Sequence, residues 1–112
     1  MSQLFVVIVA TVDEYYEFKQ EHPEHDKNQL AWFKEQNAKG NLVCCGPFYP
    51  HDGTGIWILR AENIAEVKEI VATSPRAKDN LLADETRIVE WQATIGRELL
   101  IDTALDKPLK SE

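Results

Sequence analysis

The segment "DKNQLAWFKEQNAKGNLVCCGPF", residues 26–48, joins a helix pattern to a strand pattern through a single glycine. We predict that the helix begins at Asp26, whose side chain can act as the N-cap, and ends at Gly40, because glycine readily adopts the left-handed conformation that closes helices. A strand should follow at once. This junction indicates a helix followed directly by a strand.

Two stripes of side chains follow the predicted helix at helical spacing. One is apolar and contains Leu30 and Phe33, and the other is mixed and contains Gln29, Trp32 and Gln36. Trp32 is interpreted either as a core residue or as one wall of a cleft between helix and sheet.

The strand after the helix has a candidate partner close by in the chain. "NLVCCGPF", residues 41–48, and "GIWILRA", residues 55–61, are separated by the turn-forming residues "YPHDGT". This pattern predicts an antiparallel hairpin. The loop and its glycines fit neither a P-loop nor a dinucleotide-binding pattern, which argues against a phosphate site there.

The two cysteines, Cys44 and Cys45, are adjacent in the first strand of this hairpin. We expect buried free thiols, because neighbours in a strand point to opposite faces and would form a strained disulfide. A redox pair is the alternative, although the pair lacks Cys-x-x-Cys spacing and a basic neighbour. Spacing of this kind also fits no zinc site, and we expect neither a metal nor a cofactor.

A strand and a short helix precede the segment. "LFVVIVAT", residues 4–11, is short, continuous and rich in branched side chains, which is typical of a strand buried on both faces. A short helix over residues 12–22 is predicted next, with Thr11 and Glu14 as a capping box.

A helix and a strand follow the hairpin. Residues 62–73 form an amphipathic pattern with Asn63 and Glu66 as a cap pair, and "TRIVEWQATI", residues 86–95, alternates as a strand does. The complete order is strand, helix, strand, strand, helix, strand. This order predicts an α+β fold, the ferredoxin-like βαββαβ arrangement with an antiparallel sheet.

Length and charge limit the kinds of function to consider. The 112 residues suffice for one domain, and we assign residues 1–95 to it and residues 96–112 to a C-terminal extension, partly docked and partly disordered. The formal net charge of −7 opposes nucleic-acid binding. No apolar run reaches membrane-spanning length and the N-terminus does not look like a leader, so we expect no membrane partner and a cytoplasmic location.

The predicted strands are apolar on both faces, although two helices cover only one face of such a sheet. We therefore predict a homodimer in which two copies stack through the open sheet face, since a two-fold contact covers both faces at once. The alternative is that the C-terminal extension and loops cover this face.

The segment "QLAWFKEQNAKGNLVCCGPF" resembles the YCII-related family, whose members carry a helix with Leu-Ala-Trp-Leu-Lys, then Ala-x-Gly, a hydrophobic strand and Gly-Pro. The resemblance extends over roughly residues 3–95. The matching positions in this chain are Leu30, Ala31, Trp32, Lys34, Ala38, Gly40, Leu42, Gly46 and Pro47.

This resemblance implies a dimeric α+β barrel, related in architecture to muconolactone isomerases and small antibiotic-biosynthesis monooxygenases. Some relatives are enzymes, including a dehydrochlorinase of chlorinated hydroxyquinols that uses a histidine and an aspartate. Family members usually carry that histidine just before Leu-Ala-Trp and the aspartate in an Asp-Pro after the second helix. This chain has Gln29 and Ser74 there. Neither side chain can serve as an acid or base near neutral pH.

His25 lies four residues before Gln29 and is the candidate for a relocated base. His51, Asp52 or Asp79 could supply its partner. The alternative is that His22 and His25 only decorate the helix entrance.

Two functions remain open at this stage. The first is a module that binds a small cyclic or aromatic molecule without converting it. The second is a lyase, an isomerase or a dehydrochlorinase-like enzyme with His25 as the catalytic base. The candidate ligand-binding residues are Gln29, Trp32, Tyr49, Trp57 and Ser74.

Overall fold

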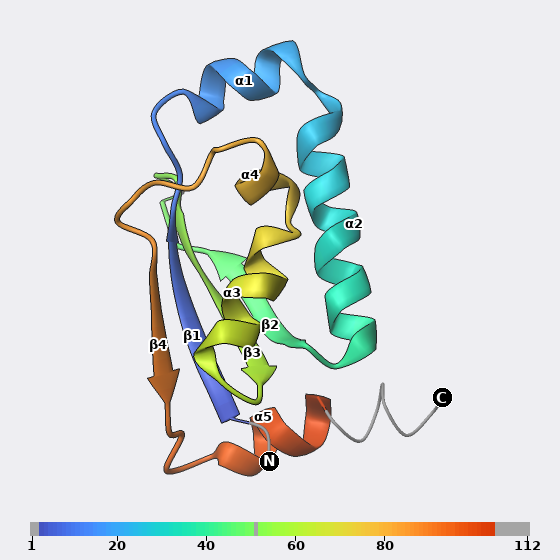
Figure 1. Ribbon diagram of the computed structural model, residues 1–112, viewed down its shortest axis with the longest axis vertical. Coiled ribbons are helices and arrows are strands. Elements are labelled where there is room, and N and C mark those ends of the chain that lie inside the picture. The colour runs from blue at the N-terminus through green and yellow to red at the C-terminus, as the bar shows by residue number, and fades with distance from the viewer. Residues whose placement is uncertain (1–2, 51, 105–112) are drawn as a thin grey trace.

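A computed structural model describes residues 3–50 and 52–104 (Figure 1). The predicted disorder at the end of the extension falls largely on residues 105–112, which lie outside the described residues, as does His51. The elements are β1 (Gln3–Ala10), α1 (Tyr15–Glu21), α2 (Glu24–Lys39), β2 (Leu42–Pro47), β3 (Thr54–Ala61), α3 (Ile64–Ala72), α4 (Pro75–Lys78), β4 (Arg87–Trp91) and α5 (Arg97–Ala104).

The strands form one antiparallel sheet in the order β2-β3-β1-β4. Each crossover between non-adjacent strands contains a long helix and a short one, α1 with α2 and α3 with α4. The predicted ferredoxin-like α+β fold is therefore confirmed, with each of its two helical connections divided in two.

The main core lies between this sheet and the helices α2 and α3. Val7 on β1 is in register with Trp57 on β3 and with Ile88 on β4, so these three side chains share the helix-facing side. Val67 of α3 and Trp32 of α2 cover them, and both are buried. Burial of apolar area of this kind is the main favourable contribution to folding.

The helix α2 begins slightly earlier than the sequence suggested. Pro23 occupies the N-cap position without a side-chain bond, and Asp26 lies inside the first turn. The prediction that Asp26 caps the helix is wrong, because its carboxylate accepts a hydrogen bond from Tyr15 Oη at 2.7 Å. The predicted end is confirmed, since Gly40 has a left-handed backbone with φ of 84°.

The predicted capping box of the first helix is also wrong. Glu14 occupies the N-cap position of α1, and no side chain caps it. Thr11 instead holds the tip of the β2–β3 hairpin, because its amide and its hydroxyl both donate to the Gly53 carbonyl, at 2.9 Å and 3.0 Å. Thr11, just after β1, therefore binds the hairpin and is not available to cap α1.

The second helical connection follows local sequence rules closely. Asn63 caps α3 as predicted, with its side-chain oxygen accepting the Glu66 amide at 2.9 Å. Ser74 caps the four-residue α4 in the same way, through the Ala77 amide at 3.2 Å. The turn from α3 into α4 is held by two backbone hydrogen bonds, from the Ser74 amide to the Val71 carbonyl and from the Lys78 amide to the Ser74 carbonyl, both at 3.0 Å.

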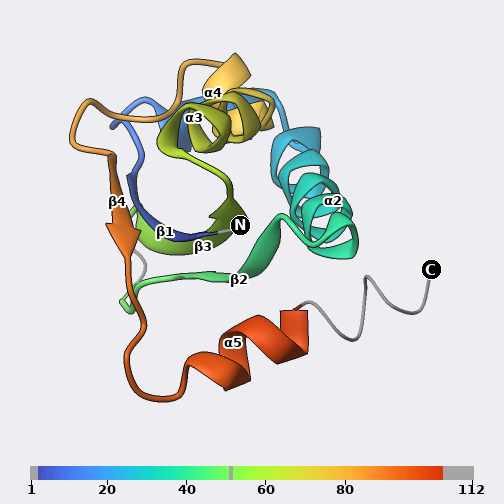
Figure 2. The same cartoon turned by 60° about the horizontal axis from the view of Figure 1, so that its bottom comes forward.

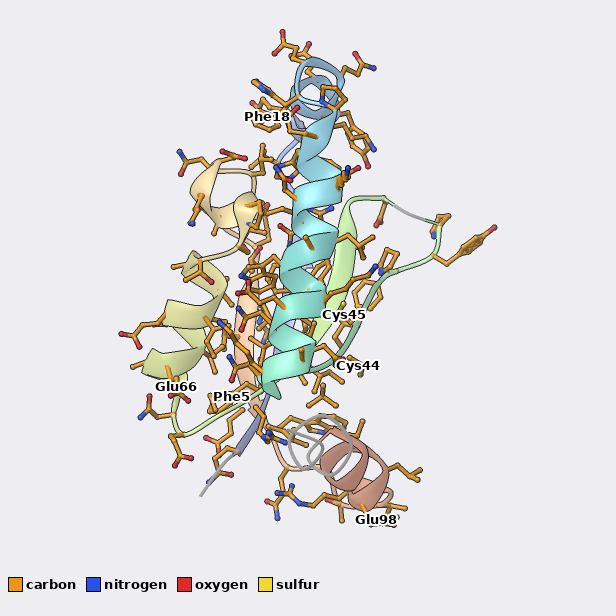
Figure 3. All side chains as sticks on the ribbon, turned by 90° about the vertical axis from the view of Figure 1, so that its right-hand side faces the viewer. Phe5, Phe18, Cys44, Cys45, Glu66 and Glu98 are labelled. Atoms are coloured by element: carbon orange, nitrogen blue, oxygen red, sulfur yellow. The ribbon has the colours of Figure 1, made fainter. Side chains whose placement is uncertain are left out.

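The cysteines contradict the prediction of buried thiols. Cys44 and Cys45 are both exposed, because β2 is an edge strand whose register shifts between Leu42 and Cys44. Figure 3 shows both on β2, beside α2. Partial burial still raises the pKa of each thiol, which favours the protonated, less reactive form.

The opposite face of the sheet is only partly covered. Figure 2 shows α5 on this side and the helices α2 and α3 on the other. Leu100 of α5 packs near Leu4 and Ile58, which are buried, whereas Val89 and Trp91 on β4 remain 38% and 37% exposed. The alternative prediction, that the C-terminal extension covers this face, thus holds at one end of the face, where α5 packs. No helix among the described residues is long and apolar enough to cross a membrane.

Candidate functional site

A cavity of about 260 Å³ lies at the end of the sheet where β1 stops. The cavity is walled by β1, the β2–β3 hairpin, α1, α2 and α4. A volume of this size is near the lower limit for small-molecule sites. It would suit a ligand of about one ring.

Aromatic side chains form much of the cavity wall. Phe33 and Trp57 pack edge to face at one side, with ring centroids 5.3 Å apart, and Tyr15 and Tyr16 pack in the same manner at another, also at 5.3 Å. Such rings offer flat apolar area to a planar ligand.

Two glycines of the hairpin determine how closely the walls approach. A Cβ at Gly55 would lie 2.8 Å from the Gly46 carbonyl oxygen, and a Cβ at Gly53 would lie 2.6 Å from Thr11 Oγ1. Gly53 also has φ of 91°, which side chains other than glycine rarely adopt. Gly55 thus allows β2 and β3 to approach each other closely, and Gly53 allows the hairpin tip to fold against Thr11 at the end of β1.

The charged part of the wall is positive. Lys19 and Arg76 are the charged residues among the described lining residues, and no carboxylate is among them. The Arg76 guanidinium lies 4.9 Å from the centre of the Tyr15 ring, and its Nη2 donates to Tyr15 Oη at 3.1 Å. Lys19 Nζ lies 5.1 Å from the same ring centre.

Asp26 contacts Tyr15, Lys19 and Arg76, and its carboxylate balances part of the positive charge of the two cations. It accepts the Tyr15 hydroxyl, and its carboxylate lies 3.6 Å from Arg76 Nη2 and 4.0 Å from Lys19 Nζ. Burial, followed by the hydrogen bond to Asp26, raises the pKa of Tyr15 to about 12. Tyr15 is therefore a neutral hydrogen-bonding group near pH 7 and is not a base.

The two positions where relatives are expected to carry a histidine and an aspartate come together at the start of α4. Gln29 is 1% exposed, and its Oε1 accepts the Arg76 amide at 3.1 Å. Ser74 is fully buried and accepts the Ala77 amide. Both side chains thus bind the backbone of α4, and neither lies in the described cavity wall.

The other predicted ligand-binding residues separate into three environments. Trp57 lies in the cavity wall. Trp32 is a core residue whose Nε1 donates to Thr73 Oγ1 at 2.9 Å, with its ring packed on Trp57. Tyr49 is 85% exposed on the hairpin and lies outside the described wall. A ligand-binding role for each of these residues remains a prediction.

His25 is not among the residues that line the cavity. The residue is 3% exposed and packs edge to face on Phe18, which Figure 3 shows on α1 beside the start of α2. Its Nδ1 lies 3.2 Å from Asp79 Oδ2, so Asp79 is the partner that the structure provides. The other ring nitrogen, Nε2, is buried without a hydrogen-bond partner in the described structure.

Within residues 3–50 and 52–104, no group of three or more histidine, cysteine or acidic side chains is arranged to hold a metal ion. The side chains that line the cavity are mainly aromatic and cationic.

Sequence reasoning overlooked the cationic group. Arg76 follows Ser74 and Pro75, which are helix-start residues, and nothing in that pattern shows that α4 points at a cavity. Tyr15 lies in the short helix predicted over residues 12–22, and nothing in that pattern shows that it faces Arg76. The bonds from the backbone of α4 to Gln29 and Ser74 position Arg76 at the cavity, and they are visible only in the structure.

The sheet order and the cavity at its end define this chain as a small ferredoxin-like α+β domain. Solved structures that share the fold include the following two. The first, a 5-chloro-2-hydroxyhydroquinone dehydrochlorinase from Burkholderia phenoliruptrix in complex with 2,5-dihydroxybenzoquinone, has a TM-score of 0.66 and 19% identity, with 81% of this chain and 95% of that chain covered. The second, a proposed antibiotic biosynthesis monooxygenase from Bacteroides thetaiotaomicron, has a TM-score of 0.55 and 9% identity, with 84% and 90% covered.

Sequence comparison assigns the chain to a family. The YCII-related domain matches residues 4–92, so the protein belongs to the YCII-related family. No significant match to a curated protein was found. The resemblance seen in the sequence is thereby confirmed.

Proposed function

We propose that the protein binds a small cyclic or aromatic molecule in the cavity between the β2–β3 hairpin and α1. The carrying observation is the cavity itself, which is about 260 Å³ in volume and walled by aromatic rings from three elements. Membership in the YCII-related family and the ligand named with the dehydrochlorinase neighbour support the choice of ring compounds.

Ligand-dependent stabilisation would test this proposal. 2,5-Dihydroxybenzoquinone should raise the melting temperature of the purified protein and give saturable heats in calorimetry, because a ligand that binds the native state stabilises it. A panel of other hydroxyaromatics and lactones extends the test. No shift and no heat with any compound would overturn the proposal.

Two tyrosine variants locate the ligand. Tyr16→Ala removes an exposed part of the cavity wall and should weaken binding by about tenfold, since aromatic contact contributes on the order of 1 kcal/mol. Tyr49→Ala is the matched change on the hairpin, outside the described wall. It tests the predicted role of Tyr49 directly, because equal weakening by both variants would place the ligand across the hairpin tip.

A second candidate function is proton-transfer catalysis by His25. The observation that favours it is the pairing of Nδ1 with Asp79 while Nε2 has no partner, which is how a carboxylate orients an imidazole base. Because His25 lies outside the described cavity wall, the cavity would have to open toward it. Chloride release from 5-chloro-2-hydroxyhydroquinone provides a test. Turnover that is lost in His25→Gln supports catalysis, and unchanged turnover overturns a role for His25.

We also propose that the protein acts as a homodimer through the open sheet face. The support is the exposed apolar side chains of β4 on the side opposite α2 and α3. The cytoplasmic location expected from the sequence stays a prediction, as does the division at residue 95.

A further inference from the structure

The cationic group in the cavity wall suggests which ring compounds the protein selects. We infer that the cavity binds acidic ring compounds in their anionic form, with Arg76 as the residue that recognises the negatively charged oxygen and Lys19 as its support. This inference rests on the proposed binding function. It specifies in addition that the ligand is negatively charged and that Arg76 recognises this charge.

The charge distribution is the first argument. The chain has a formal net charge of −7, yet both charged residues of the described cavity wall are cations. Asp26 is the carboxylate in contact with them, so this contact group of Lys19, Arg76 and Asp26 is left with one uncompensated positive charge. A cation retained at a hollow surface of an acidic protein favours an anionic ligand over a neutral one of the same shape.

The unused hydrogen-bonding capacity of Arg76 is the second argument. A guanidinium has five N–H donors, of which Nη2 contacts Tyr15 and Asp26, while the buried Nε has no partner in the described structure. The Arg76 side chain is 21% exposed and lines the cavity, so a ligand oxygen there can approach its guanidinium, although Nε itself is closed to solvent. Bonds from a guanidinium to an anionic oxygen are also the stronger kind.

Arg76 is held in place by the residues that replace the expected histidine and aspartate. Gln29 accepts the Arg76 amide, and Ser74 accepts the Ala77 amide, so the backbone on either side of the Arg76 side chain is fixed. The Tyr15 ring and hydroxyl then fix the guanidinium itself. Gln29 and Ser74 are thus positioning residues for Arg76, whose side chain lines the cavity.

Tyr15 supports the assignment as a neutral relay. Its hydroxyl donates to Asp26 and accepts from Arg76, and its raised pKa keeps it protonated. It therefore adds no negative charge that would repel an anion.

Two matched pairs of compounds test the inference and separate the two sources of an anionic oxygen. Benzoate and benzamide have nearly the same shape and differ in charge through a carboxylate. 2,5-Dihydroxybenzoquinone, a vinylogous acid that is ionised at neutral pH, and its neutral dimethyl ether differ through ring hydroxyls. In at least one pair, calorimetry should show that the anion binds about tenfold or more tightly than the neutral compound. Added NaCl should weaken the binding of the anion and leave the binding of the neutral compound unchanged.

Variants assign the preference to Arg76. The anion preference is the ratio of the affinity for the anion to that for the neutral compound. Arg76→Gln should reduce this ratio to near one, Arg76→Lys should retain part of it, and Lys19→Gln should reduce it less than Arg76→Gln does. Lys68→Gln is the matched control, because it makes the same change in net charge at an exposed position on α3. Circular dichroism and the binding of the neutral compounds show whether each variant remains folded and keeps its cavity.

The outcomes are distinguishable. If the neutral and anionic members of both pairs bind equally, or if Arg76→Gln leaves the preference unchanged, the anion inference is overturned while cavity binding stands. If no compound of either charge binds, the proposed binding function fails, and the inference fails with it.

Discussion

At the level of single residues, the hydrogen bonds of Tyr15 determine the chemistry available at the cavity. Its hydroxyl lies between a carboxylate and a guanidinium, and its pKa is raised to about 12. The ionised form is therefore disfavoured in the folded protein relative to the unfolded chain, where tyrosine titrates near pH 10. Tyr15 consequently stabilises the fold only while it is protonated.

The Tyr15→Phe variant should reveal this dependence on pH. Because the folded pKa is raised, the contribution of Tyr15 is fully present below pH of about 10 and is lost as the pH rises toward 12. The difference in unfolding free energy between wild type and Tyr15→Phe, measured in urea, should be constant from pH 7 to 9 and then shrink. A difference that stays constant to pH 12 would contradict the raised pKa.

His25 gives a second residue-scale prediction, which concerns stability alone. His25→Ala removes a 3% exposed ring that packs on Phe18 and pairs with Asp79, and it should lower the free energy of unfolding by about 2 kcal/mol. His22→Ala is the control, since the His22 side chain is 48% exposed, and its effect should stay within about 0.5 kcal/mol. Equal effects in chemical denaturation would show that His25 is only part of a polar helix entrance.

Residue-level prediction from sequence was therefore uneven. Asp79 was one of three candidate partners for His25, and geometry was needed to choose it, because the two residues are 54 positions apart. Gln29 and Ser74 were recognised as replacements for titrating groups, but their role in holding α4 depends on backbone bonds that no pattern encodes. Arg76 was missed for the same reason.

At the level of elements, local signals worked where a helix end is determined by neighbours in sequence. Gly40 and Asn63 act as predicted at the end of α2 and the start of α3. Predictions failed where a tertiary partner competes for the capping group. Thr11 binds the hairpin, Asp26 binds Tyr15, and neither caps a helix.

The β2–β3 hairpin offers an element-scale prediction with a built-in control. Gly53→Ala places a Cβ 2.6 Å from Thr11 Oγ1 at a left-handed φ of 91°, and it should destabilise the protein by about 1–3 kcal/mol. Gly46→Ala, on the same hairpin, meets nothing within 4 Å and should change stability by less than about 0.5 kcal/mol. Thermal or urea denaturation compares them, and similar losses would show that the Thr11 contact does not constrain the hairpin tip.

At the level of the whole molecule, one face of the sheet packs against α2 and α3, and the other face is covered only at the end near α5 (Figure 2). Leu4 and Ile58 are buried near α5, whereas Val89 and Trp91 stay more than a third exposed on the same side. The sequence predicted apolar strands on both faces correctly but left open what covers the second one. In the structure, α5 of the C-terminal extension covers only one end of this second face (Figure 2).

A second copy of the chain is the partner that we expect over the remaining area. An isologous contact would cover the exposed side chains of β4 on both copies simultaneously, and two-fold dimers are the commonest closed assemblies. Sedimentation equilibrium should therefore give twice the chain mass of 12.8 kDa at micromolar concentration. Val89→Asp should shift the protein to monomer, because a carboxylate would be buried at the contact. Leu30→Asp is the matched control, since Leu30 is 52% exposed on α2, on the other side of the sheet, and this variant should remain dimeric. A wild-type protein that sediments as a monomer would show instead that this domain tolerates an exposed apolar sheet face.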